Sequence, residues 1–299
     1  MDYRLCVDDL LNRSYALIDL PDAAARAAEA VIVEGRRFFE SDAAEKLASA
    51  NPSILEGYRS LGSEKDAVTG RPDLMETFST WFRNQDGQDP RKWAASCQLH
   101  AAMRSALVPF AQIAEEVLST LATELAGAGW LGQVPPIRDL SYLQTNFSRP
   151  AEHRRSDRQT LMDGHEDGHL LTIVVPTQPG LVGCPGDRDP KAAYDEFDRF
   201  IPRGGYEPID TRPGQAVIMS GSPTYYMTAG RVRPLFHAVE NLGHRERQSL
   251  MFFANPDRGT PIRPWLVSEE NRDVDVHQVV EMMSQKYGQP ALSEAFSKT

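Results

Sequence analysis

The chain has 299 residues, with 32 Lys and Arg against 42 Asp and Glu, which gives a formal net charge of −10. This balance argues against a protein that binds nucleic acid along a basic face, because neutralising phosphates requires clustered positive charge. Hydrophobic residues make up 41% of the chain, and no stretch approaches the roughly 20 apolar residues that a membrane helix needs.

The three cysteines, Cys6, Cys97 and Cys184, are far apart in the sequence and form no Cys-x-x-Cys pair. An odd number of separated cysteines favours a reduced, cytoplasmic protein over a disulfide framework or a cysteine-ligated zinc site. The first thirty residues lack a basic segment that leads into an apolar run, so we expect no secretory signal.

Two helices are predicted in the first part of the chain. Residues 21–40 are rich in alanine and begin with Pro21, a residue favoured in the first helical turn. Residues 99–127 repeat apolar side chains at spacings of three and four, which predicts a long helix with a kink at Pro109. We therefore expect residues 1–135 to form a helical N-terminal region.

After residue 135 the pattern changes to short runs rich in β-branched and aromatic residues, separated by Gly, Pro and Asp. No long helical pattern lies between these runs, which favours a β-sandwich or jelly roll over alternating βα units. We expect one domain, with a β core at 136–256 and a helical region at 257–299 whose clearest part is 276–288. The predicted strands are residues 140–147, 170–176, 215–221, 224–228, 235–241 and 248–256.

Residues 184–205 interrupt this β region with a polar, charged segment that is too long for a hairpin turn. A long insertion of this kind is either a lid or binding loop, or a solvated excursion with one short helix.

The sequence DGHEDGHLLTIVVP at 163–176 is the most informative stretch, and it has two interpretations. His165, Glu166 and His169 match the H-E-x-x-H motif of zinc peptidases, in which a helix places both imidazoles on one face. The surrounding glycines and the following β-branched run disfavour a helix. We therefore favour a strand, although the zinc peptidase remains the alternative enzyme class.

On a strand, residues two apart share a face, so His165 and Asp167 would converge while Glu166 points away. One imidazole and one carboxylate supply two ligands of the 2-His-1-carboxylate triad that holds Fe(II). His237, in a strand-like run 70 residues after Asp167, is the best candidate for the third ligand. His169 is better explained as a structural or substrate-facing residue.

Arg247 and Ser249 begin a later strand-like run and share a face by the same rule. An arginine with a neighbouring hydroxyl is well suited to bind a carboxylate through charge-assisted hydrogen bonds.

In this ordered set of motifs the sequence resembles the Fe(II)/2-oxoglutarate-dependent dioxygenases, and within them the branch of isopenicillin N synthase and the plant gibberellin oxidases. The likeness extends over nearly the whole chain, from a strand and helix at 17–40 to the final strand. The motifs that carry it are His165-Glu166-Asp167, Leu170-Leu171-Thr172, His237, Arg247-Gln248-Ser249 and Phe253-Ala254-Asn255-Pro256.

The resemblance implies a double-stranded β-helix (a jelly-roll, cupin-like fold) in which His165, Asp167 and His237 hold Fe(II). It further implies that 2-oxoglutarate chelates the iron while its distal carboxylate binds Arg247 and Ser249, and that O2 is the oxidant. Ser148 stands where the family has a tyrosine, so we expect Asn146 to provide a further hydrogen bond to 2-oxoglutarate. No catalytic residue is expected beyond the metal centre.

We therefore expect an oxygenase that acts on a small molecule by hydroxylation, desaturation or oxidative cyclisation, as in bacterial natural-product (antibiotic) biosynthesis. Phe147, His169 and Tyr225 are the expected substrate-pocket residues. We expect no nucleic-acid or membrane partner, and a monomer or weak homo-oligomer. The non-enzyme alternative is a binding or sensor module that keeps the fold without turnover.

Overall fold

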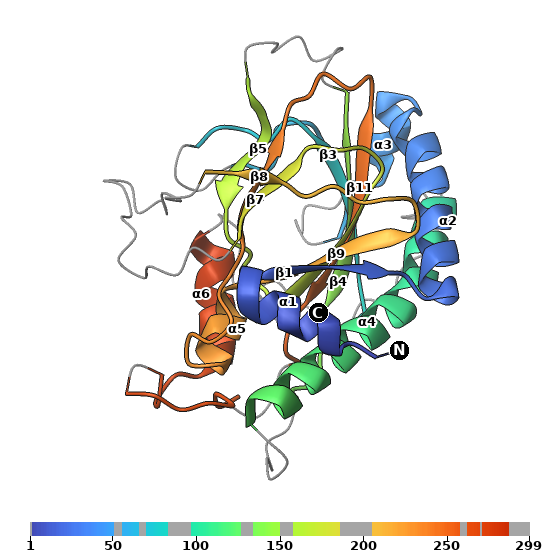
Figure 1. Ribbon diagram of the computed structural model, residues 1–299. Helices are drawn as coiled ribbons and strands as arrows, with labels where there is room; N and C mark the ends of the chain where they lie inside the picture. Colours follow the sequence, from blue (N-terminus) through green and yellow to red (C-terminus); the bar gives the residue numbers. More distant parts are fainter. Residues whose placement is uncertain are drawn as a thin grey trace.

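The computed structural model describes residues 2–50, 56–65, 70–82, 97–126, 134–149, 158–185, 205–257, 262–269 and 271–286. Two antiparallel sheets form its centre (Figure 1). The main sheet has the strand order β1 (Tyr15–Asp19), β9 (Gln215–Ser220), β6 (Leu171–Pro176), β11 (Arg247–Ala254), β4 (Tyr142–Ser148), β3 (Glu76–Trp81) and β2 (Gly57–Arg59). The minor sheet has the order β5 (Thr160–His165), β10 (Phe236–Glu240), β7 (Leu181–Cys184) and β8 (Glu207–Pro208).

From β4 onward the chain crosses repeatedly between the two sheets. Strands β4, β6, β9 and β11 belong to the main sheet, and β5, β7, β8 and β10 belong to the minor sheet. This alternation is the connectivity of a jelly roll. The predicted double-stranded β-helix is therefore confirmed.

Helices α2 and α4 cover one face of the main sheet, α1 and α3 contact its edge strands β1 and β2, and α5 and α6 contact each other (Figure 1). α2 and α4 contact each other, and both contact β11 and β4. In the part of the chain that the structure describes, no helix is long and apolar enough to cross a membrane. The helices are α1 (Arg4–Arg13), α2 (Asp22–Phe39), α3 (Ala43–Ala48), α4 (Cys97–Ala126), α5 (Ser222–Met227) and α6 (Val276–Lys286).

Helix α2 shows how the sequence produces this packing. Its buried residues, Ala24, Ala28, Val31, Gly35 and Phe38, recur at spacings of three and four and therefore line one face of the helix. Gly35 allows α2 to approach β11 closely, because a Cβ atom there would lie 2.2 Å from Nε2 of the Gln248 side chain.

The two faces of the main sheet have different roles, as strand β11 illustrates. Leu250 and Phe252 pack in the hydrophobic cluster that includes α2 and α4. Met251 and Phe253 belong to a second cluster that they share with residues of the minor sheet, such as Leu161. We call the side of the main sheet that is turned toward the minor sheet the inner face, and the functional residues described below lie on it or beside it.

Several predictions from the sequence are wrong in detail. Residues 224–227 of the predicted strand at 224–228 form part of helix α5, because Pro223 is in its first turn and Gly221 caps it in an extended conformation. The N-terminal region is not purely helical, since β1, β2 and β3 join the main sheet. The predicted long helix is confirmed as α4, which contains Pro109, and the kink there stays a prediction. Residues 186–204, most of the predicted loop, lie outside the described residues.

Candidate functional site

Three potential metal ligands converge where the minor sheet meets the start of β6. His165 ends β5 and lies opposite His237 of β10 in the strand register, and Asp167 follows in the turn toward β6. Oδ1 of Asp167 lies 3.6 Å from Nε2 of His165 and 3.9 Å from Nε2 of His237. One ligand atom from each of the three residues lies within 4.8 Å of the other two.

Hydrogen bonds orient all three side chains toward a common point. Nδ1 of His165 lies 2.9 Å from the carbonyl oxygen of Asp163, and Nδ1 of His237 lies 3.0 Å from that of Leu235. Because a carbonyl can only accept, each Nδ1 carries a proton, so Nε2 is the atom that each imidazole would offer to a metal in its neutral form. Thr172 donates to Oδ2 of Asp167 over 2.5 Å, which leaves Oδ1 for the centre.

The charges at this centre fit a bound cation. Burial alone would raise the pKa of Asp167, but His237 and His165 hold that pKa well below its usual range. Burial alone would lower the pKa of His165, but Asp167 outweighs it and raises the pKa to about 9. Burial lowers the pKa of His237 to about 4. Without a metal, His165 is therefore protonated at neutral pH and pairs with the ionised Asp167, and a metal ion would replace the proton on Nε2. One carboxylate and two imidazoles are then the donor set that suits a divalent transition metal.

The main chain around Asp167 is held by the start of α5, which the sequence analysis did not anticipate. The Ser222 N–H donates to the Asp167 carbonyl over 2.9 Å, and the Ser222 hydroxyl donates to Glu166 over 3.1 Å. A Cβ atom on Gly221 would lie 2.0 Å from the carbonyl oxygen of His169 and 2.6 Å from that of Asp167. Only glycine therefore allows α5 to approach the ligand turn this closely.

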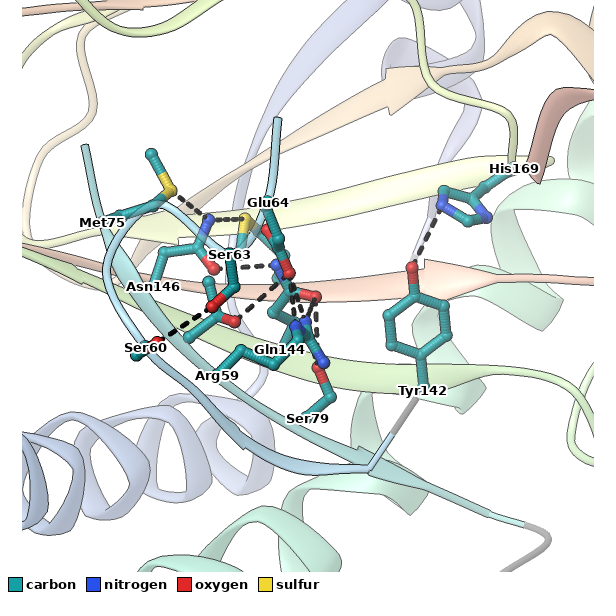
Figure 2. A network of polar contacts seen from close by, with 12 residues as sticks. Arg59, Ser60, Ser63, Glu64, Met75, Ser79, Tyr142, Gln144, Asn146 and His169 are labelled. Atoms are coloured by element: carbon teal, nitrogen blue, oxygen red, sulfur yellow. Dashed lines mark hydrogen bonds and ion pairs between the residues drawn. The ribbon is translucent and has the colours of Figure 1, made fainter. Parts of the chain in front are cut away.

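The zinc-peptidase interpretation is wrong, because residues 163–169 form a strand end and a turn rather than a helix. His169 is occupied elsewhere: its Nδ1 lies 2.9 Å from Oδ1 of Asn255 and its Nε2 lies 3.3 Å from the Tyr142 hydroxyl (Figure 2). Its ring also contacts Phe253, with ring centroids 4.5 Å apart. His169 therefore belongs to an aromatic group on the inner face.

Arg247, Ser249 and Asn146 lie together on the inner face, where Ser249 and Asn146 are register partners on β11 and β4. Arg247 is 5% exposed, and its Nε donates to the carbonyl of Pro179 over 3.2 Å. Within the described ranges, no carboxylate pairs with this guanidinium. Burial lowers its pKa to about 10, so it stays charged at neutral pH.

The donors of Ser249 and Asn146 are engaged only by weak acceptors among the described residues. The Ser249 hydroxyl lies 3.9 Å from Sδ of Met251, and Nδ2 of Asn146 lies 3.0 Å from Sδ of Met75 (Figure 2). A thioether sulfur is a poor acceptor, so an oxygen ligand would satisfy both donors better. The three side chains together are a candidate anion site.

The other expected pocket residues are placed differently. Phe147 points to the helix side of the main sheet and stacks on Phe39, with ring centroids 5.1 Å apart. The prediction that Phe147 lines a substrate pocket is therefore wrong, since strand aromatics alternate between faces. Tyr225 lies on α5, where its ring packs over Gly230 and against Tyr226. Its pocket role stays a prediction.

The sequence analysis also missed a polar network on the inner face beside the anion site (Figure 2). Arg59 on β2 pairs with Glu64 and donates to the side chains of Ser79 and Gln144 over 3.0 and 2.8 Å. Gln144 in turn donates to Asn146 over 2.9 Å. These residues carry no recognisable motif, because they come from three separate segments that only the sheet register brings together.

No protein-family model matches the chain, and no curated protein matches it in sequence. Solved structures do match, among them a full-length Neurospora crassa protein in complex with alpha-KG and 5-formyluracil, with a TM-score of 0.69 and 14% identity over 93% of this chain and 88% of that one. JOX2 in complex with 2OG, Fe and JA matches with a TM-score of 0.63 and 18% identity over 92% and 79%.

A protein from Caulobacter crescentus that is described as a 2OG-Fe(II) oxygenase family protein matches with a TM-score of 0.70 and 18% identity, over 94% of this chain and 92% of that one. At these identities the likeness establishes the fold. The chain thus shares its jelly-roll fold with these three structures.

Proposed function

We propose that the protein is a non-haem oxygenase that uses Fe(II), 2-oxoglutarate and O2 to oxidise a small molecule. The observation that carries this proposal is the His165, Asp167 and His237 cluster in the same jelly roll as a buried Arg247 that no carboxylate of the described residues neutralises. The structural neighbours support it, because the Neurospora crassa protein and JOX2 have been crystallised with alpha-KG and with 2OG and Fe, respectively.

His165, Asp167 and His237 would hold the metal through Nε2, Oδ1 and Nε2, the atoms that their hydrogen bonds leave available. Three protein ligands leave the remaining coordination positions of a six-coordinate ion for substrates. When bound, Fe(II) and 2-oxoglutarate supply the oxidising chemistry, with succinate and CO2 as co-products. The protein's contribution is to place the reactants and exclude water.

Arg247 would bind the distal carboxylate of 2-oxoglutarate, assisted by the Ser249 hydroxyl and the Asn146 amide. A buried guanidinium without a counter-charge is costly because its desolvation is not repaid. A dianionic co-substrate supplies that counter-charge. A metal-binding module without turnover, or an iron oxidase that does not use 2-oxoglutarate, would leave the buried charge of Arg247 without a purpose.

The experiment is an anaerobic titration of the purified protein with Fe(II) and then with 2-oxoglutarate, monitored by visible absorption. We expect a charge-transfer band that appears only when both are present, followed by O2-dependent release of succinate. A wild-type protein that binds iron but forms no band would refute the co-substrate assignment. His165→Ala and Asp167→Ala should abolish iron binding, and retention of one iron per chain by either variant would refute the ligand assignment.

The finer parts of the proposal rest on the sequence. The isopenicillin N synthase-like branch and a role in bacterial natural-product biosynthesis come from the motif resemblance, and a cytoplasmic location comes from the cysteine usage. Succinate release across a panel of natural-product intermediates tests the first two, because a true substrate should couple succinate formation to its own oxidation.

A further inference from the structure

Asp73 is a buried carboxylate at the corner where the main sheet meets β5. Its N–H donates to the carbonyl of Glu64 over 2.9 Å, and the next N–H, of Leu74, donates to the carbonyl of Leu161 on β5 over 2.9 Å. Two residues further on, Met75 contacts Asn146 on the inner face (Figure 2). The main chain thus fixes Asp73 between the polar network and the strand that ends in His165.

The side chain of Asp73 lacks a partner in the part of the chain that the structure describes. The residue is 8% exposed, yet among the described residues no donor bonds its carboxylate and no cation pairs with it. The two arginines of this corner are committed to another acid, since Arg71 approaches Asp163 to 2.6 Å and Arg158 approaches it to 3.4 Å.

The nearby polar network does not compensate Asp73 either. Nη2 of Arg59 pairs with Glu64 over 2.5 Å and also donates to the side chains of Ser79 and Gln144 (Figure 2). The acids around Asp73 each have a basic partner: Glu64 has Arg59, Asp163 has two arginines, and Asp167 has the histidines. Among these described acids, Asp73 differs in having none.

Burial and nearby charges both act on the pKa of the Asp73 carboxyl. Burial and the negative charges of Glu64 and Asp163 raise its pKa to about 7, while His165 and Arg158 act in the opposite direction. Arg158 donates to the carbonyl of Pro72, the residue before Asp73, and approaches Asp163, two residues before His165, so Asp73 lies close to the end of β5. A buried polar group without a partner costs free energy unless a ligand satisfies it.

We propose that Asp73 is a specificity-determining residue that binds a basic nitrogen, an amine or guanidine, of the primary substrate beside the metal centre. This inference rests on the proposed function, because it assumes that the bound molecule is the one to be oxidised. A cationic group would give Asp73 the charge-assisted partner that the surrounding arginines do not provide. Of all substrate classes, a small molecule with an ammonium or guanidinium group fits best.

The test measures binding of matched probes to the Fe(II)- and 2-oxoglutarate-loaded protein under anaerobic conditions. The cationic probes are 2-phenylethylamine and 2-phenylethylguanidine, and the uncharged counterparts are N-acetyl-2-phenylethylamine and 2-phenylethanol. Ligand-observed NMR detects weak binding, and competition provides the dissociation constants. We expect wild-type protein to bind the cations at least tenfold more tightly than the uncharged counterparts.

Asp73→Asn keeps the size of the side chain and removes its charge, and we expect it to abolish that preference. The matched control is Asp19→Asn, which removes an exposed acid on β1, at the opposite edge of the main sheet from β2. It should keep the wild-type preference.

Equal binding of charged and uncharged probes by wild-type protein, absence of cation binding, or an unchanged preference in Asp73→Asn would each overturn the inference. The comparison within the wild type holds even if Asp73→Asn does not fold. The charge-transfer band, recorded on the same samples, reports separately on iron and 2-oxoglutarate. A protein that forms the band but shows no cation preference refutes the role of Asp73 while the proposed function stands.

Discussion

Removing the charge of Asp73 should stabilise the ligand-free protein, and the gain should depend on pH. The pKa of Asp73 is raised from 3.8 to about 7, chiefly by burial. A carboxyl whose pKa is higher in the folded state binds a proton more tightly there than in the unfolded chain. The stabilising proton is fully bound below about pH 4 and is lost as the pH rises through 7.

The size of this change in stability follows from the rise in the pKa of Asp73. Each pKa unit corresponds to about 1.4 kcal/mol, so the full penalty for ionising Asp73 in the folded, metal-free protein is roughly 4 kcal/mol above pH 7. At pH 5 only about 1.5 to 2 kcal/mol of this penalty has developed. The stability advantage of Asp73→Asn over wild type should therefore grow by about 2 to 3 kcal/mol between pH 5 and pH 8.

The assay is urea unfolding of metal-free wild type, Asp73→Asn and Asp19→Asn at both pH values. Metal must be removed because a cation beside His165 would itself favour the ionised form of Asp73. The pKa of Asp19 is lowered by its hydrogen bond with Arg212, so Asp19 is ionised throughout this window and its removal should add no pH dependence. An advantage of Asp73→Asn that is the same at pH 5 and pH 8 would refute the reasoning.

Three further predictions concern the metal centre and the anion site. Thr172→Val removes the donor to Asp167 and should weaken Fe(II) binding by about 10- to 100-fold, measured by metal titration, with Thr172→Ser as the variant that restores binding. Gly221→Ala would force a Cβ into the carbonyl oxygens of Asp167 and His169, so we expect a similar loss of metal affinity; unchanged affinity would show that α5 does not hold the turn. Arg247→Gln should weaken 2-oxoglutarate binding by about 100-fold, from the loss of roughly 3 kcal/mol of charge-assisted bonding, while Fe(II) binding in the same titration stays intact.

The strands that carry the metal and anion sites could be predicted from sequence because their chemistry and their periodicity coincide. In the run that became β11, Arg247 and Ser249 alternate with Gln248 and Leu250, and the structure places the two pairs on opposite faces. The convergence of His165 and Asp167 was predicted from the period of a strand, but the structure achieves it through a turn, because β5 ends at His165. Strand alternation was therefore sufficient for Arg247 and Ser249, whereas the position of Asp167 also depends on the main-chain bond from Ser222.

Strand β3 was missed because its sequence, ETFSTW, lacks a clear alternation of polar and apolar residues. Thr77 and Ser79 face the inner side, and Ser79 joins the polar network. Glu76 faces the other side and is buried in a pair with Lys46. Both faces therefore carry polar groups whose partners come from distant segments, and such partners cannot be read from a single strand.

Helix α5 was mistaken for a strand for a different reason. Its aromatic residues, Tyr225 and Tyr226, have high strand propensity, but propensity is a weak preference that tertiary context overrides. The deciding residues are Gly221 and Pro223, which begin the helix against the turn that carries Asp167. The helix thus supports the candidate metal site, although its sequence contains none of the three potential ligands.

Two buried charges of opposite sign, Arg247 and Asp73, lack an ionic partner among the described residues of the jelly roll, and their separation explains why both persist. If they could reach one another they would form an ion pair, and neither would then be available to a ligand. Arg247 instead extends from β11 to the Pro179 carbonyl, and Asp73 is held by main-chain bonds to Glu64 and, through its neighbour, to β5. Each charge therefore depends on a separate ligand for its compensation.

A dianionic co-substrate and a cationic substrate would each relieve the desolvation penalty of one buried charge in the ligand-free protein, so each should stabilise the fold as it binds. The same separation gives selectivity, because a molecule of the wrong charge at either position would add to the penalty instead of relieving it.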